Sequence, residues 1–176
     1  MARKLILYTA CSLDCFIAGQ NNELDWLMDG NENADFGYKE FYSSISTTIS
    51  GYKTYSVTLG FGQFPYPGKE NFIFSRNHEN NEGHPAIFIK EDPVEFVKKL
   101  KLLEGGDIWL VGGGQINGLL IDADLIDEMI LFYVPVVLGQ GIPLFQGNQQ
   151  TRKLELTDSF IYDGGMVKLV YKKINY

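Results

Sequence analysis

The chain has 176 residues, of which 45% are hydrophobic and 21% are charged, and its formal net charge at pH 7 is −7. These proportions predict one globular domain over residues 1–176, and the acidic balance argues against nucleic acid as a partner, because nucleic acid requires a basic face. Every apolar run is shorter than the about 18 residues that a membrane span needs, and no signal-peptide cleavage pattern follows the first run, so no membrane partner is expected.

The first part of the chain predicts a strand, a loop and a helix. Residues 4–12 form an apolar run typical of a buried strand, and the Asn-rich residues 13–27 predict an irregular loop. From Tyr38 to Ile45, aromatic and aliphatic side chains recur at the spacing of one helical face. We therefore predict a helix over residues 34–48.

The next part alternates short strands with turns. Residues 48–51 predict a second strand that runs into a helix at residues 52–59, and the Gly- and Pro-rich residues 60–69 predict a loop. Further strands are predicted at residues 71–75 and 86–89, on either side of a polar, turn-like segment.

A capping pattern marks the following helix. Asp92 is suited to the N-cap, Pro93 to the first helical position, and Glu95 to a carboxylate that reaches back to the N-cap. The helix should run to about residue 103, and a strand is predicted at residues 107–111.

The last part of the chain completes an α/β pattern. A helix at residues 115–121, a strand at 128–134 and a loop at 135–145 precede two alternating segments, 154–160 and 166–172, which predict an antiparallel hairpin. Taken together, about eight strands and four helices predict an α/β fold. We expect a central mixed sheet with helices on both faces and a C-terminal antiparallel hairpin.

The two cysteines, Cys11 and Cys15, share one apolar segment, and neither has a distant partner in the sequence. A disulfide framework is therefore not expected, and the reducing cytoplasm is the natural location. His78 and His84 lie far along the chain from both cysteines, so no metal site is expected.

Three consecutive glycines, Gly112, Gly113 and Gly114, stand between a predicted strand and a predicted helix. This arrangement lets the N–H groups at a helix N-terminus approach an anion, as in dinucleotide-binding sites. However, Asn117 occupies the third glycine position of the G-x-G-x-x-G pattern, and no acidic ribose partner ends the following strand. The cluster alone is compatible both with a phosphate cradle and with a tight turn that binds nothing.

Four blocks in a fixed order carry a more specific signal. They are Ser12-Leu13-Asp14-Cys15-Phe16-Ile17-Ala18-Gly19, Gly51-Tyr52-Lys53-Thr54-Tyr55, Phe74-Ser75-Arg76, and the glycine cluster followed by a P-x-x-x-G-x-G-x-P-L-F pattern at residues 135–145. In this order the chain resembles the dihydrofolate reductase-like superfamily. Within this superfamily, the chain most resembles the reductase domain of the riboflavin-biosynthesis deaminase-reductase and its stand-alone relatives.

The resemblance implies a three-layer dihydrofolate reductase-like fold and an NADPH-dependent reductase. Its substrate would be a small heterocycle, either pterin-like (dihydrofolate) or ribosylamino-pyrimidinone-like, that accepts a hydride at a C=N or C=O bond. The resemblance also implies that NADPH lies along the C-terminal ends of the strands and that the protein forms a homodimer.

The resemblance assigns thirteen positions to the cofactor NADPH. They are Ala10, Ile17 and Ala18 at the nicotinamide, Gly51, Lys53 and Thr54 at the phosphates, Ser75 and Arg76 at the 2′-phosphate, and Gly112, Gly113, Gly114, Gln115 and Ile116 at the pyrophosphate. Tyr52 departs from the family, which has Arg at this position, and a tyrosine cannot make a charged, bidentate phosphate contact. For each position, core packing or a solvated surface side chain is the alternative.

Asp35 is the candidate catalytic residue. Counted back from Gly51, it matches the carboxylate with which dihydrofolate reductases assist protonation of the pterin. Beside Phe36 and Trp26 its pKa could be raised, which would suit a proton donor. An Asp at a helix start is equally suited to a cap, and Asp14 is a second candidate acid or a turn residue.

The predicted substrate-binding residues share an ability to contact a flat, polar heterocycle. They are Trp26, Phe36, Lys39 and Phe64. Two other functions remain open at this point: a non-catalytic NADP(H)-binding or regulatory module, which the tyrosine at position 52 favours, and a nucleotide-dependent enzyme of another class, such as a transferase.

Overall fold

The computed structural model describes residues 3–27, 35–62, 64, 66–80, 84–147 and 150–174. The strands are β1 (Leu5–Ser12), β2 (Phe16–Ala18), β3 (Ile45–Gly51), β4 (Glu70–Phe74), β5 (Ala86–Ile89), β6 (Asp107–Gly112), β7 (Glu128–Val134), β8 (Ile142–Pro143), β9 (Leu154–Ile161) and β10 (Val167–Lys173). The helices are α1 (Tyr38–Ser44), α2 (Tyr52–Leu59), α3 (Pro93–Leu102) and α4 (Gly114–Asp122), with a short 3-10 turn at Asp25–Leu27.

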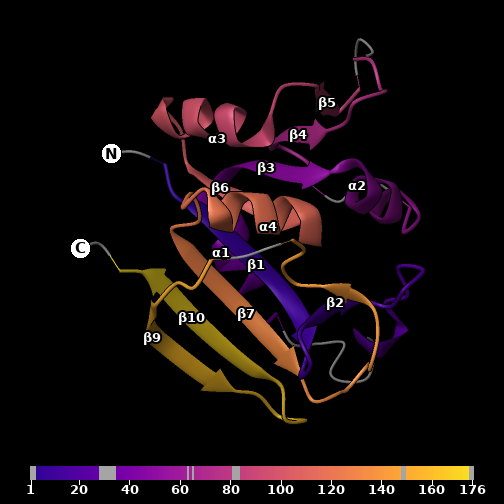
Figure 1. The fold of residues 1–176 in the computed structure, drawn as a ribbon, viewed down its shortest axis with the longest axis vertical. Coiled ribbons are helices and arrows are strands. Elements are labelled where there is room, and N and C mark those ends of the chain that lie inside the picture. The colour runs from indigo at the N-terminus through magenta and orange to yellow at the C-terminus, as the bar shows by residue number, and fades with distance from the viewer. Residues whose placement is uncertain are drawn as a thin grey trace.

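Eight strands form one mixed sheet in the order β5-β4-β3-β6-β1-β7-β10-β9 (Figure 1). The pairs from β5 to β7 are parallel, whereas β10 runs antiparallel to both β7 and β9. β2 and β8 pair separately as a small antiparallel sheet. The predicted central mixed sheet and the C-terminal antiparallel hairpin are therefore confirmed.

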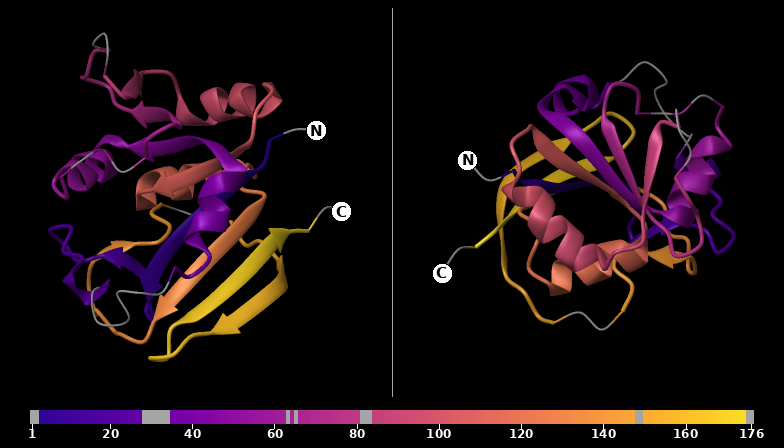
Figure 2. Two further views of the ribbon diagram at one scale, coloured as in Figure 1. Left: turned by 180° about the vertical axis from the view of Figure 1, so that it is seen from behind. Right: turned by 90° about the horizontal axis from the view of Figure 1, so that it is seen from above.

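Helices cover both faces of the large sheet and complete three layers. α4 lies in front of the sheet in one view, and α1 lies in front of it after a half-turn (Figures 1 and 2). On the α4 face, Leu7, Ile49 and Leu110 are fully buried in the main core. On the α1 face, a second cluster joins Ile6, Phe41 and Trp109. Successive strand residues point to opposite faces, so β1 supplies side chains to both cores.

The helix predicted over residues 34–48 is shorter than expected. α1 ends at Ser44, the strand β3 begins at Ile45, and residue 34 lies outside the described residues. The stretch from Ile45 to Ile49 is rich in β-branched side chains and pairs between β6 and β4. Ile45 continues the apolar spacing of the helix by coincidence, because it faces the same core from a strand.

The two predicted loops at residues 13–27 and 135–145 each contain a short strand. β2 and β8 come from these loops and pair with each other. Two or three residues are too few to show an alternation in the sequence, and a pairing over so great a separation leaves no local signal.

The capping prediction for α3 is confirmed for the N-cap and wrong for its partner. Oδ1 of Asp92 accepts hydrogen bonds from the N–H groups of Val94 (3.0 Å) and Glu95 (3.1 Å). The Glu95 carboxylate does not reach back to the cap and instead accepts from Nζ of Lys98 at 2.8 Å. An ion pair three residues apart on one exposed helix face competes with the reciprocal cap.

Candidate functional site

The sheet order brings the predicted cofactor-binding segments to one edge. Neighbouring parallel strands β4, β3 and β6 end at Phe74, Gly51 and Gly112, and the next residues of each segment lie beyond the same carboxyl edge. Ligands of α/β proteins bind at this edge, where the loops that follow the strands meet. Residues far apart in sequence therefore form one continuous rim.

At this rim the first turns of two helices lie against each other. A Cβ atom built on Gly51, before α2, would be 3.3 Å from Cγ1 of Ile116 in α4. A Cβ atom on Gly113, before α4, would be 3.0 Å from Oγ1 of Thr54 in α2. Neither helix has a side-chain cap at its N-terminus. Two sets of uncapped N–H groups and two positive dipole ends therefore converge, which favours an anion at this point.

The glycine turn is packed from behind by the segment that holds β8. A Cβ atom on Gly114 would be only 2.3 Å from the carbonyl oxygen of Pro143, so a side chain at this position would force the backbone to move. Asn117 is buried, and its Nδ2 donates to the carbonyl of Leu144 at 2.9 Å. Asn117 therefore holds α4 to the 142–145 segment, which explains an amide where the dinucleotide pattern has a third glycine.

The segment after β4 contains a histidine, His78, which is not among the predicted cofactor-binding residues. The imidazole of His78 stacks on the ring of Tyr52, with centroids 3.7 Å apart and planes at 19°. Nδ1 of His78 lies 2.7 Å from Oγ of Ser75, and Arg76 is exposed beside them. Tyr52, Ser75, Arg76 and His78 thus form one group at the end of the rim.

The positions matched to the nicotinamide lie at the other end. Ala18 is buried in β2, and a Cβ atom on Gly141 would be 2.3 Å from the carbonyl oxygen of Ala18, so the two backbones touch. Ile17 packs against the main core, and Ala10 lies on β1 opposite Phe132 of β7.

Asp14 organises this end rather than facing a cavity. Its carboxylate accepts from Oγ of Ser12 (2.6 Å) and from the N–H groups of Leu138 (3.1 Å) and Gly139 (2.7 Å). These hydrogen bonds, that of Ser12 first, lower the pKa of the Asp14 carboxyl. The sequence allows Asp14 to be either a catalytic acid or a turn residue, and these contacts favour the turn residue.

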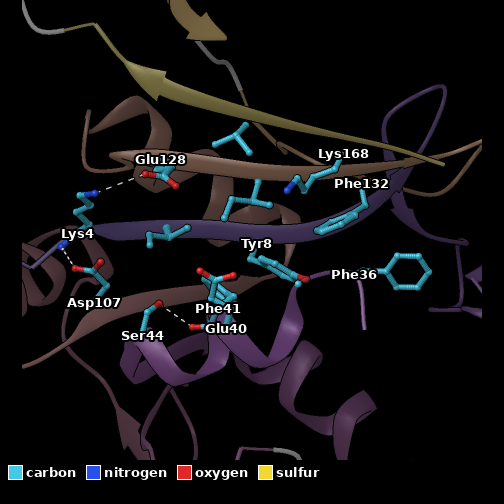
Figure 3. A pocket seen from close by; sticks show the side chains of 14 residues that line it. Lys4, Tyr8, Phe36, Glu40, Phe41, Ser44, Asp107, Glu128, Phe132 and Lys168 are labelled. Atoms are coloured by element: carbon cyan, nitrogen blue, oxygen red, sulfur yellow. Dashed lines mark hydrogen bonds and ion pairs between the residues drawn. The ribbon is translucent and has the colours of Figure 1, made fainter. Parts of the chain in front are cut away.

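A groove of about 310 Å³ lies on the α1 face, between α1 and strands β1, β7 and β10 (Figure 3). Its lining combines aromatic and aliphatic side chains with charged groups. Lys4, Asp107 and Glu128 lie at one end, and Lys168 lies toward the other end, near Phe132 (Figure 3). The lining residues are Lys4, Ile6, Tyr8, Phe36, Gly37, Glu40, Phe41, Ser44, Asp107, Glu128, Ile130, Phe132, Lys168 and Val170.

Tyr8 is the central polar side chain of this groove and was not predicted. Its ring stacks on Phe41, with centroids 4.2 Å apart, and lies 5.0 Å from the ring of Phe132. Burial raises the pKa of the Tyr8 phenol well above its usual range, and Tyr162 and Asp35 add to the shift. The phenol therefore remains protonated and can donate a hydrogen bond. The alternation of β1, which points even-numbered residues toward α1, was the available signal.

Asp35 lies at the start of α1, close to the groove, and is exposed. Its Oδ2 accepts from the N–H of Lys39 at 3.2 Å, and its carbonyl accepts from the N–H of Tyr38 at 2.8 Å. The carboxylate therefore accepts a hydrogen bond from an N–H group at the start of α1. Its negative charge also contributes to the raised pKa of the Tyr8 phenol.

The four predicted substrate-binding residues lie in separate places. Phe36 borders the groove, and its ring meets that of Tyr162 edge-on at 4.9 Å. Lys39 is exposed on α1, and Trp26 borders a different hollow of about 300 Å³. Phe64 packs against Tyr55 and Tyr66 under α2. Sequence proximity placed Trp26 beside Phe36, but in the fold only Phe36 borders the groove.

Comparisons with known proteins agree with this architecture. The family model described as RibD C-terminal domain matches residues 68–168. The Bacillus subtilis protein YwjB is 38% identical over 157 residues, which cover 89% of this chain and 90% of YwjB. A structure from Shewanella sp. PV-4, whose name refers to riboflavin biosynthesis, has a TM-score of 0.87 at 25% identity and covers 99% of this chain and 100% of its own.

A more distant structure shares the fold. The diaminohydroxyphosphoribosylaminopyrimidine deaminase/5-amino-6-(5-phosphoribosylamino)uracil reductase of Thermotoga maritima has a TM-score of 0.73 at 15% identity, over 98% of this chain and 57% of that one. Within the described residues, no helix is long and apolar enough to cross a membrane. With a family match over more than half its length, the chain belongs to the RibD C-terminal domain family, an oxidoreductase family of the dihydrofolate reductase-like superfamily.

Proposed function

We propose that this protein is an NADPH-dependent reductase that delivers a hydride to a C=N or C=O bond of a ribosylamino-pyrimidinone-like or pterin-like heterocycle. One observation carries the proposal: the uncapped N-termini of α2 and α4 converge at Gly51 and Gly113, beside Ser75 and Arg76. Two helix ends at a glycine turn suit a pyrophosphate, and an adjacent arginine suits an additional phosphate.

The residues of the rim fit the parts of NADPH in order. The N–H groups of Gly114, Gln115 and Ile116 would hold the pyrophosphate at the start of α4, with Thr54 and the exposed Lys53 on the side of α2. Arg76 and Ser75 would contact the 2′-phosphate. Ala10, Ile17 and Ala18 would hold the nicotinamide through their backbone groups. When bound, NADPH supplies the hydride.

The groove beside α1 is the proposed substrate site. Its volume of about 310 Å³ is at the lower end of the range for small-molecule pockets, and the rings of Tyr8, Phe36 and Phe132 offer faces and edges to a flat heterocycle. The Tyr8 phenol would donate a hydrogen bond to the heterocycle. Asp35, at the edge of the groove, would assist protonation of the atom next to the one that receives the hydride.

The relatives favour a pyrimidine over a pterin. The matched family is the RibD C-terminal domain, and the Thermotoga maritima neighbour carries the name of a phosphoribosylaminouracil reductase. A ribosylamino-pyrimidinone is therefore the first substrate to test, and dihydrofolate is the second.

Two measurements test this proposal. The protein is titrated with NADPH and NADH, and the absorbance of the reduced nicotinamide is then followed after addition of either substrate. We expect micromolar binding of NADPH and oxidation of NADPH with one of the two substrates. Absence of NADPH binding would overturn the proposal. Binding without turnover of either substrate would instead favour a non-catalytic NADP(H)-binding module.

A further inference from the structure

We propose that His78, positioned by Tyr52 and Ser75, contacts the 2′-phosphate of the cofactor and so adds a phosphate contact at a site where position 52 lacks the arginine of the family pattern. The inference rests on the proposed function, because it assigns an additional specificity residue to the same NADPH site. It concerns the group formed by Tyr52, Ser75, Arg76 and His78 at the end of the rim.

The imidazole of His78 is held on several sides. Tyr52 lies parallel to one face at 3.7 Å, Phe88 lies 5.4 Å away at 33°, and Oγ of Ser75 is 2.7 Å from Nδ1. Both Tyr52 and His78 are half-buried, so their packing limits the orientations that the ring can adopt. A ring held in this way loses little conformational freedom when it binds an anion.

The contact between Ser75 and His78 allows either partner to donate, because a hydroxyl and a ring nitrogen can each carry the proton. If the Ser75 hydroxyl donates to Nδ1, the neutral imidazole carries its proton on Nε2, and this Nε2–H can donate to a phosphate. If both ring nitrogens carry protons, Nδ1 donates to Oγ of Ser75, and both Nε2 and the Ser75 hydroxyl can donate to the phosphate. A phosphate bound at Ser75 and Arg76 would lie beside the ring that Ser75 anchors, and it accepts such a donor well.

This arrangement gives the tyrosine at position 52 a role. Tyr52 is the first residue of α2, so its side chain begins at the phosphate-facing end of the helix. An arginine there could contact a phosphate directly, whereas the tyrosine has no charge to offer. Its ring instead packs against the imidazole of His78. The hydrogen-bond donor to the phosphate is then His78, in the segment that follows β4, and not the first residue of α2.

The test uses isothermal titration calorimetry to compare two probes that differ only in the 2′-phosphate, namely 2′,5′-ADP (adenosine 2′,5′-bisphosphate) and 5′-AMP. We expect His78→Gln to weaken the binding of 2′,5′-ADP by about 10-fold, the typical effect of one lost charge-assisted hydrogen bond, and to leave the binding of 5′-AMP unchanged. His84→Gln is the matched control, because His84 also lies near Phe88 but bonds to the Tyr55 hydroxyl at 3.1 Å. It should change neither affinity.

A second pair of variants tests the support from Tyr52. Tyr52→Phe retains the ring and should keep the preference for 2′,5′-ADP, whereas Tyr52→Ala should reduce it. If His78→Gln keeps the wild-type preference, or if it weakens both probes equally, the role of His78 is overturned while the proposed function stands. If the wild-type protein binds neither NADPH nor 2′,5′-ADP, the proposed function fails and this inference fails with it.

Discussion

Replacement of Gly114 by alanine tests whether the glycine cluster is required by packing as well as by a ligand. The new Cβ would lie 2.3 Å from the carbonyl oxygen of Pro143 and 3.5 Å from Cγ2 of Ile142. Carbon and oxygen atoms do not approach so closely, so the backbone of α4 or of β8 must move by roughly 1 Å. This movement would strain the hydrogen bonds from Gln146 N–H to Gly114 and from Asn117 to Leu144.

The magnitude follows from two opposing effects. Overpacking of a rigid site costs about 1–3 kcal/mol, and alanine recovers up to about 1 kcal/mol of helix propensity relative to glycine. We therefore expect Gly114→Ala to lower the free energy of unfolding by about 1–2 kcal/mol, measured by urea denaturation. Because the strain moves the first turn of α4, NADPH affinity should fall as well.

Gly113→Ala is the matched control for this prediction. Its Cβ would meet Oγ1 of Thr54 at 3.0 Å, and this contact is with a side chain that can rotate. The loss of stability should therefore be smaller, and Thr54→Ala in the same chain should relieve it. A Gly114→Ala variant as stable as the wild type would refute the argument from the contact with Pro143.

Four further outcomes are expected. Arg76→Ala should weaken NADPH much more than NADH, by about 10-fold in a titration; equal losses would contradict a contact with the 2′-phosphate. Tyr8→Phe keeps the stacking on Phe41 and should leave thermal stability nearly unchanged while lowering kcat with the substrate; unchanged kcat would exclude the phenol from the reaction. Asp14→Asn should destabilise the protein at neutral pH and have less effect in acid, as measured by urea denaturation. Folding lowers the pKa of the Asp14 carboxyl, so its contribution to stability is present above the unfolded pKa and is lost as the pH falls through the folded pKa. An equal effect at both pH values would argue against this role. Light scattering should give the mass of a homodimer, and a monomer at micromolar concentration would contradict the expectation from the family.

The order of the elements and the type of fold could be predicted from local patterns. Strand-forming runs such as residues 4–12 and 128–134 carry their own signal, since a buried strand needs a continuous apolar sequence. The N-cap at Asp92 could also be predicted from the sequence, because capping depends on residues within one helical turn. The motif order then led to the family, which the family match confirmed.

Features that depend on contacts between residues distant in the sequence could not be predicted from local patterns. The pairing of β2 with β8 joins segments more than a hundred residues apart, and the stacking of Tyr52 on His78 joins a helix start to a turn that looked merely polar. The helix predicted over residues 34–48 is too long, because Ile45 continues the helical spacing of apolar residues although β3 begins at this residue.

The candidate site shows the same division. The strand–glycine–helix pattern at residues 112–114 predicts a phosphate-bearing ligand, because that signal is contained in a few adjacent residues. Gly51 and Arg76 are assigned to the cofactor only by the resemblance to the family. Only the tertiary structure shows that α2 and α4 begin beside each other and that Tyr8, but not Trp26, borders the groove. It also shows that the Asp14 carboxylate accepts hydrogen bonds from the loop at residues 138–139. These outcomes depend on how strands distant in sequence align in the sheet, and backbone and side-chain contacts between them leave no pattern within either segment.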